Sequence, residues 1–321
     1  MAFQNFPFPI DQERTGISLA YSNKRYIADE VSPRVGVASP EFKWLLRNRD
    51  EAFTVPETMV GRTSQPNEVQ FGGSDQTGFV RDYGLDDLVP NDDIEKAPAG
   101  FDPLGTAVEG LTDLVALDRE QRVATLYFTA SNYPAANRAT LSGTSQWSDF
   151  ANSDPYTAIN TARDGMLMPP NIGVIGRQAW SRLKVHPKIT AALAPSSTGN
   201  TLTSNGAGAP ATLQAVAELL ELDRILVGEA WINSAKPGQT ASLVRVWGKH
   251  MALLHQNPIG STTNGKVITF GYTAEFGNRV SGSIPEPKIG LRGSQRVRVG
   301  ESVNEIIAAS DVGYLFSNVV A

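Results

Sequence analysis

The chain has no cysteine and only three histidines among its 321 residues. The absence of cysteine excludes disulfides, thiolate zinc sites, iron–sulfur clusters and cysteine nucleophiles. The three histidines, His186, His250 and His255, are too few to favour a histidine-rich metal site. We therefore expect neither a metal nor a cofactor.

Long apolar runs, an excess of positive charge and a secretory signal are also missing. No run approaches the ~18–20 apolar residues of a membrane span, and residues 1–14 lack the basic and apolar regions of a signal peptide. The chain carries 28 basic and 33 acidic residues, and this net charge of −5 argues against a basic nucleic-acid binder. A hydrophobic content of 41% indicates a folded globular protein of about two domains, made in a cytoplasm.

The first 90 residues contain too little apolar sequence for a core of their own. Residues 1–40 lack periodicity and carry three prolines, which predicts an extended arm that covers its own domain or straps a neighbouring subunit. Residues 51–90 predict a projecting two-stranded loop, which must lean on another surface because a lone hairpin is marginal in water. The apolar residues of both segments are the candidate inter-subunit contacts: Phe3, Phe6, Phe8, Phe53, Val55, Met59, Val69, Phe71 and Phe79.

The clearest helix signal begins at Asp102 and Pro103, a carboxylate N-cap followed by proline at the first helical position. Apolar residues then recur at four-three-four spacing: Leu104, Val108, Leu111 and Val115. A helix over 103–131 would be roughly 43 Å long at 1.5 Å per residue. We interpret it as a strut.

The sequence also contains two charge clusters, one before this helix and one near the C-terminal end of the chain. The stretch Asp82–Glu95 is acidic, contains no base and does not match a calcium loop, so it predicts a solvated acidic turn. Lys288, Arg292, Arg296 and Arg298 form a basic cluster. Contact with nucleic-acid phosphates is one interpretation; the negative net charge favours a solvated strand face or pairing with another subunit's carboxylates.

Gly260–Lys266 fits the first seven positions of a phosphate-binding loop, G-x-x-x-x-G-K. Such a loop needs a hydroxyl residue next and then a helix. Val267 follows instead, and the next residues predict a strand. A polar turn is therefore favoured, and nucleotide hydrolysis stays as an unlikely alternative. No G-x-S-x-G occurs, and His186, before Pro187, is expected to cap a helix.

From residue 156 onward the pattern is α/β with a β-rich tail, and several segments carry recognisable motifs. NIGVIGRQAWSRLKVHPKI (171–189) is similar to a strand, a Trp-containing helix and a His-Pro-x-Ile motif of tailed-phage major capsid proteins, which share the Hong Kong 97-type fold. ELLELDRILVGEA (218–230), LVRVWG (243–248) and GYT (271–273) resemble later segments of that family. These are packing motifs without a catalytic group.

The resemblance implies an α+β fold with four parts. Residues 1–48 would form an N-terminal arm and 49–92 an extended β-loop. Residues 93–168 and 259–321 would form a peripheral domain with the spine helix 103–131, and 169–258 an α/β axial domain. The implied function is that of a non-enzymatic major capsid protein, which self-assembles into hexamers and pentamers of an icosahedral shell around double-stranded DNA. An encapsulin-like compartment is the alternative within the fold; those proteins have an N-terminal helix where this chain has a proline-punctuated arm.

The resemblance also implies partners and a location. The partners are copies of the chain, a portal, an optional decoration protein, DNA held non-specifically and a separate scaffolding protein, since only about 100 residues precede the long helix. No membrane is involved, and the expected location is the virion, assembled in the bacterial host cytoplasm. The family prototype joins a loop lysine to a neighbour's asparagine, but no lysine occurs here between Lys43 and Lys96. Asn278 and Asn318 are therefore not expected to cross-link.

Overall fold

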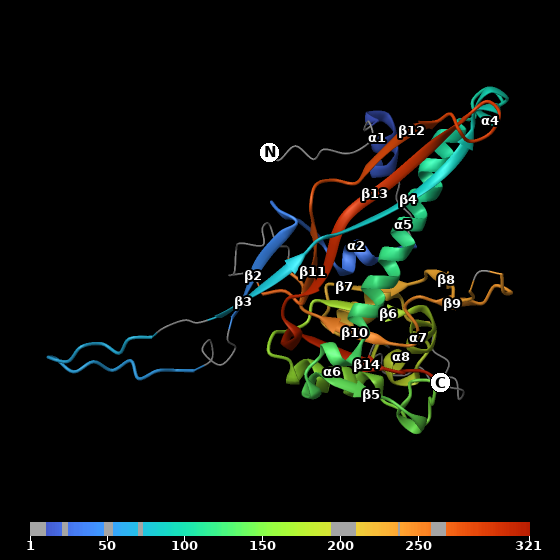
Figure 1. Cartoon of the computed structure of the whole chain (residues 1–321). Helices are drawn as coiled ribbons and strands as arrows, with labels where there is room; N and C mark the ends of the chain where they lie inside the picture. Colours follow the sequence, from blue (N-terminus) through green and yellow to red (C-terminus); the bar gives the residue numbers. More distant parts are fainter. Residues whose placement is uncertain are drawn as a thin grey trace.

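The structure is a computed structural model that describes residues 11–20, 25–47, 54–69, 73–193, 210–236, 238–257 and 268–321. It contains two five-stranded sheets. The long helix α5 (Pro103–Tyr127) runs along the first sheet and reaches the second with its C-terminal end (Figure 1). A thin loop extends far from this body on one side (Figure 1).

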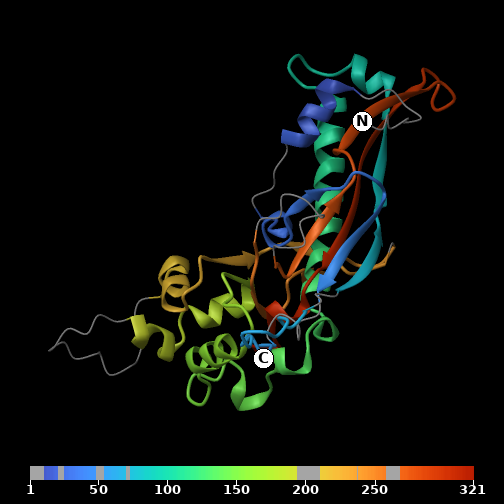
Figure 2. The ribbon, with the colours of Figure 1, turned by 90° about the vertical axis from the view of Figure 1, so that its left-hand side faces the viewer.

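The first sheet is built around β13, a strand of 14 residues. One edge of β13 pairs with β4 and the other pairs first with β12 and then with β11; β1 adds to β11 in parallel. The strands are β1 (Arg34–Gly36), β4 (Arg81–Pro90), β11 (Gly271–Glu275), β12 (Val280–Glu286) and β13 (Ser294–Ile307). Figure 2 shows α5 covering one face of this elongated sheet.

Helix α5 begins where the sequence predicted, with Leu104 N donating to the Asp102 carboxylate at 3.0 Å. Its apolar stripe packs on the sheet through a buried cluster: Val89, Val108, Leu111, Val297 and Val299. The helix ends at Tyr127, four residues before the predicted end. Asn132 Nδ2 donates to Leu126 O at 2.7 Å and Tyr133 Oη to Tyr127 O at 2.6 Å, so side chains satisfy carbonyls that another turn of helix would use.

The second sheet has the order β5–β14–β10–β6–β7. Its strands are β5 (Arg138–Thr140), β6 (Ile172–Gly176), β7 (Arg224–Gly228), β10 (Met251–Leu254) and β14 (Gly313–Ser317). Every residue of β6 and β10 is buried, which explains their unbroken apolar sequence. The accompanying helices are α6 (Pro155–Gly165), α7 (Arg177–Leu183), α8 (Pro187–Leu193) and α9 (Leu213–Leu219).

Two details of this part concern features that were visible in the sequence. The apolar runs 224–232 and 243–254 do not each form one continuous strand, because β8 (Trp231–Asn233) and β9 (Leu243–Arg245) form a separate hairpin. His186 caps a helix as predicted: its Nδ1 accepts from Lys188 N at 3.2 Å at the start of α8.

The N-terminal segment departs from the predicted extended arm. It contains α1 (Gln12–Ala20) and α2 (Ala28–Val31), and α1 packs on α5 and β12 of its own chain. Asp11 begins α1, because its carboxylate accepts from Arg14 N and its carbonyl from Thr15 N. The local sequence lacked a strong apolar repeat, so α1 is stabilised by tertiary contacts such as Thr112 Oγ1 donating to the buried Ser18 Oγ at 3.0 Å. The lack of an N-terminal helix was the expected difference between this chain and the encapsulins, and the presence of α1 removes that difference.

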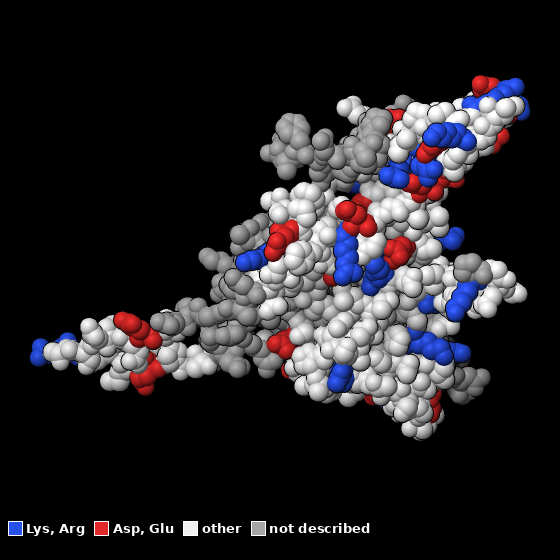
Figure 3. Space-filling model, in the orientation of Figure 1, with Lys and Arg blue, Asp and Glu red and all other residues white. Residues whose placement is uncertain are grey.

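The acidic stretch is not a solvated turn. Residues 81–90 form β4, and α4 (Asn91–Glu95) follows. Asp86 accepts from Arg298 at 2.6 Å with both carboxylate oxygens, and these hydrogen bonds lower the pKa of Asp86. Arg292 reaches Asp92 at 3.2 Å. The acidic and basic clusters thus neutralise each other within one chain, and red and blue atoms alternate there in Figure 3.

Candidate assembly site

A long exposed loop connects β2 (Glu41–Arg47) and β3 (Gly73–Phe79). The two strands pair in antiparallel register from Glu41 opposite Phe79 to Arg47 opposite Gly73. Beyond them, residues 54–69 project away from both sheets (Figure 1), and every one of these residues is exposed. The projection predicted over 51–90 is therefore only partly as expected: residues 54–69 project but contain no strand, the paired strands β2 and β3 lie at its base, and residues 81–90 belong to the first sheet.

Four of the nine candidate contact residues lie in the described part of this region. Val55 is 89% exposed and Met59 84%, and Val69 and Phe79 are also exposed. The other five, Phe3, Phe6, Phe8, Phe53 and Phe71, lie outside the described residues. Apolar side chains grouped on one exposed projection are typical of a surface that another protein covers.

A buried carboxylate that the sequence reasoning missed fixes the root of the N-terminal segment. Glu120 on α5 accepts from Ile27 N at 3.0 Å, Ala28 N at 2.8 Å and Trp247 Nε1 at 2.5 Å. Burial raises the pKa of Glu120. It precedes Val123, Ala124 and Tyr127 by three, four and seven residues, which places it on the buried apolar face of the second half of α5; this spacing is the sequence signal that could have identified it.

Arg119, next to Glu120, is 2% exposed and binds the other end of α2. It contacts the Asp29 carboxylate and donates to Ser32 O and Thr273 Oγ1, each at 3.1 Å. Burial by itself would raise the pKa of Asp29, but the positive charges of Arg119 and Arg34 lower it to about 2. The pair Arg119–Glu120 therefore holds α2 at both ends.

A second buried carboxylate, Glu301 on β13, binds Arg34 at 2.9 Å and Arg279 at 3.1 Å. Burial opposes its ionisation, but Arg34, Arg279 and Arg119 outweigh that effect and lower its pKa. Each of these carboxylates is held by arginines or N–H donors. This is a structural network that ties the N-terminal segment to α5 and the first sheet.

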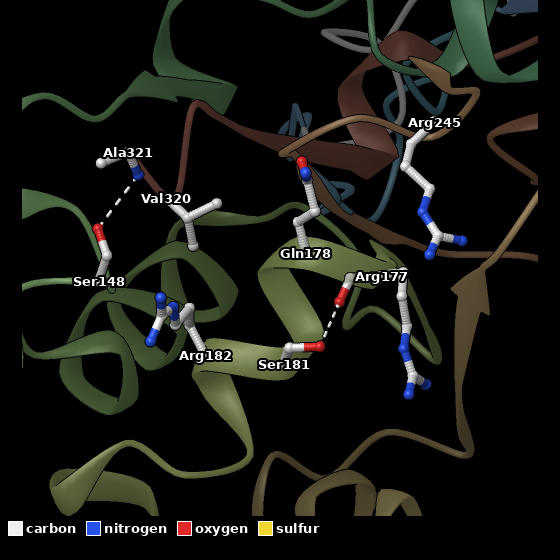
Figure 4. Close-up of a pocket in the computed structure, with 8 residues that line it drawn as sticks. All are labelled: Ser148, Arg177, Gln178, Ser181, Arg182, Arg245, Val320 and Ala321. Carbon is white, nitrogen blue, oxygen red and sulfur yellow. Dashed lines mark hydrogen bonds between the residues drawn. The ribbon is translucent and has the colours of Figure 1, made fainter. Parts of the chain in front are cut away.

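The structure also has a cavity of about 480 Å³, lined by Ser148, Arg177, Gln178, Ser181, Arg182, Arg245, Val320 and Ala321 (Figure 4). Its lining side chains include three arginines but no histidine or carboxylate to act as a general base. Ser181 Oγ donates to Arg177 O at 2.9 Å, as a helical serine commonly does. The near-Walker segment 260–266 lies outside the described residues. Among the described helices, none has the length and hydropathy of a membrane span.

Comparison with known proteins decides the family. No family model matches the chain. The major capsid protein of Pseudomonas phage JBD67 is 51% identical over 317 residues, 99% of each chain. The chain belongs to the phage major capsid proteins. The major capsid protein of Burkholderia phage BcepMu is 26% identical over 97% of this chain and 96% of its own.

Solved structures place this capsid protein in the Hong Kong 97-type fold. A phage-related protein from Bordetella bronchiseptica has a TM-score of 0.72 at 22% identity, covering 98% of both chains. The capsid of cyanophage P-SCSP1u has a TM-score of 0.58 at 10% identity, covering 99% of this chain and 93% of its own. An encapsulin complex from Synechococcus elongatus has a TM-score of 0.52 at 11% identity, covering 99% of this chain and 94% of its own. At such identities the likeness shows the fold alone.

The predicted α+β capsid fold and the structural, non-enzymatic role are therefore confirmed. The protein is a component of the virion capsid, and its relatives form a multimeric shell of many copies. The exposed loop and the buried arginine network are consistent with such a role, since the first offers a surface to neighbours and the second makes the subunit rigid.

Proposed function

We propose that this capsid protein assembles in the bacterial host cytoplasm into hexamers and pentamers of an icosahedral shell that encloses double-stranded DNA. The observation that supports this most directly is the loop 54–69, whose apolar side chains are exposed in the isolated chain. Val55 and Met59 gain burial only when another chain covers them, so association of copies lowers their free energy.

The proposed roles follow the parts inferred from the sequence. Residues 93–168 and 259–321 would act as the peripheral domain and 169–258 as the axial domain that surrounds the symmetry axes. In the arm 1–48 the residues that carry Phe3, Phe6 and Phe8, and in the loop 49–92 the projecting residues 54–69, would lie on neighbours, whereas α1, α2 and β4 pack on their own chain. Each contact can be modest, because several contacts per subunit raise the effective concentration of the others in a closed shell.

Further partners are part of this proposal. A separate scaffolding protein would set the size of the shell, a portal would occupy one vertex, and a decoration protein would add to the outer surface. Contact with the packaged DNA would be non-specific. The basic residues of β13 are not the DNA-binding candidates, because Arg298 already pairs with Asp86 and Arg296 with Glu286.

The test is expression of the chain with and without the phage's other morphogenesis genes, followed by electron microscopy and a nuclease-protection assay. Closed icosahedral shells of uniform size are expected when the other genes are present, with protected DNA once packaging proteins are included. Uniform shells from the chain alone would contradict the separate scaffold. Shells that hold only protein cargo would favour the encapsulin-like alternative.

The first prediction concerns the arm. Replacing Phe3, Phe6 and Phe8 together by serine is expected to lower the yield of shells by about threefold to tenfold, because each subunit loses one apolar contact of several. The melting temperature of the free subunit should stay the same, and Gln4→Ser with Asn5→Ser serves as the matched control. Normal shells from the triple variant would show that the arm is not a strap.

The second prediction is that no covalent bond joins the subunits. Amide formation between a side-chain amine and an asparagine needs a neutral amine, and arginine stays protonated. The described loop 54–69 offers Arg62 as its basic group and contains no lysine. Mature particles boiled in denaturing detergent should therefore run as one band near 34.5 kDa. Ladders at multiples of this mass would contradict the prediction.

A further inference from the structure

The hairpin β8–β9 is an exposed apolar element of the region around the second sheet. Leu243 is 64% exposed, Trp231 46%, and Val244 is exposed too. In the register of the hairpin Trp231 lies opposite Arg245, and Ile232 opposite Val244, so exposed apolar residues occur on both of its faces. A hairpin of this kind is marginally stable in water and is stabilised when another surface packs on it.

Arginines adjoin this hairpin. The Arg245 guanidinium lies 3.9 Å from the centroid of the Trp231 ring and donates to Glu229 O at 2.7 Å. Arg177 binds the Glu229 carboxylate at 2.8 Å. Together with Arg182, Arg245 and Arg177 line the 480 Å³ cavity (Figure 4). Arg182 is exposed, and no carboxylate in the described part of the chain pairs with it.

We infer that five residues, Trp231 and Leu243 with Arg177, Arg182 and Arg245, form a docking patch for a second copy of this chain; Trp231, Leu243 and Arg245 share one face of the hairpin. The inference rests on the proposed function and specifies one of its contacts. Tryptophan and arginine in a rigid stacked pair are the residue types that dominate binding at protein interfaces. Nucleic-acid phosphates would satisfy the arginines but would leave Leu243 exposed, which favours a protein partner.

The same chain carries a surface complementary to this patch on α9. Leu213 is 40% exposed at the start of α9, Glu218 is exposed in its last turn, and Asp223 is exposed four residues after its end. The Glu218 carboxylate accepts from Gln214 Nε2 at 3.0 Å and has no arginine partner among the described residues. Helix α9 contributes no residue to the arginine cavity and lies at one edge of the molecule (gold, left in Figure 2).

An apolar-basic patch and an acidic surface on different elements of one chain suit a head-to-tail contact. Such a contact repeats from subunit to subunit and closes into a ring when the rotation allows it. The occupant of the docking patch is therefore the α9 surface of the next subunit, with Arg182 facing Glu218 or Asp223. Charge complementarity of this kind fixes the register between copies.

The experiment is a charge swap in the full chain, expressed with the phage's morphogenesis genes. Arg182→Glu is expected to reduce the fraction of chains in shells by about tenfold or more, because it places like charges against each other. Glu218→Arg with Asp223→Arg should do the same. The combined swap should recover at least about half of the wild-type yield, since it restores opposite charges. Lys288→Glu, an exposed reversal on the first sheet, is the matched control.

Circular dichroism and the melting temperature of each free subunit verify that it folds, which is expected because Arg182 and Glu218 are exposed. If the wild-type chain and the Arg182→Glu variant both form normal shells, the docking patch is wrong but the proposed function stands. Failure of the combined swap to recover assembly would overturn the assignment of α9 as the partner. Normal shells that retain less DNA would assign the arginines to nucleic acid instead.

Discussion

A chain in which residues 54–69 are replaced by a short glycine-serine linker is expected to fold and to form almost no shells. The loop packs on neither sheet, so the melting temperature of the free subunit should change by no more than about 2 °C. Shell yield should fall below about one tenth, because the loss removes the largest exposed apolar projection from every subunit. Sedimentation and electron microscopy measure the yield, and calorimetry measures the stability.

A point variant separates the apolar contact from the mere presence of the loop. Val55→Ser with Met59→Ser keeps the length of the loop and should reproduce much of the loss. Arg62→Gln, on the same loop, changes charge but no apolar area and is the matched control. Full assembly of the serine variant would contradict the role assigned to these two side chains.

Arg119→Met is expected to be the most destabilising single substitution in α5. It leaves Asp29 and Glu305 without the buried guanidinium and removes the donors to Ser32 O and Thr273 Oγ1. The loss leaves the buried acceptors Ser32 O and Thr273 Oγ1 without this donor, which costs about 1–3 kcal/mol. Asp29 adds little because it is exposed and keeps Arg34, and Glu305 keeps Arg122. Urea unfolding of the free subunit should show this loss as a lower midpoint.

Arg122→Met is the matched control, because Arg122 lies one turn further along the same helix and also binds Glu305, at 2.9 Å. Its side chain is partly exposed, so its replacement should cost about 1 kcal/mol. Equal effects of the two substitutions would show that the buried network adds nothing beyond surface ion pairs.

The sequence predicted those elements whose signals are local. Asp102 and Pro103 specified the start of α5, and the apolar runs of β6 and β10 specified buried strands. The position of His186 before Pro187 predicted its capping role. In each case the residues that determine the element are close together in the sequence, so their pattern can be recognised without knowledge of the three-dimensional structure.

The errors came from long-range pairing. Asp86 and Arg298 are separated by 212 positions, so each appeared in the sequence as part of an unbalanced charge cluster. Helix α1 is stabilised by contacts to α5 and β12, and no local apolar repeat in the sequence predicts these contacts. Gly228, part of a motif similar to other capsid proteins, illustrates the same limit: an added Cβ would lie 2.0 Å from Trp247 Cγ, a contact that only the fold creates.

The topology of the first sheet also bears on the timing of folding during synthesis. Arg34 and Val35 in β1 pair with Thr273 and Ala274, and β4 pairs along its whole length with β13. Since a ribosome adds about 5–20 residues per second, the early segments wait roughly ten seconds or longer for their partner strands. Pairings so distant in sequence also form slowly. The subunit therefore completes its first sheet only near the end of translation, and until then β1 and β4 lack their partner strands, which leaves half-made chains prone to premature association.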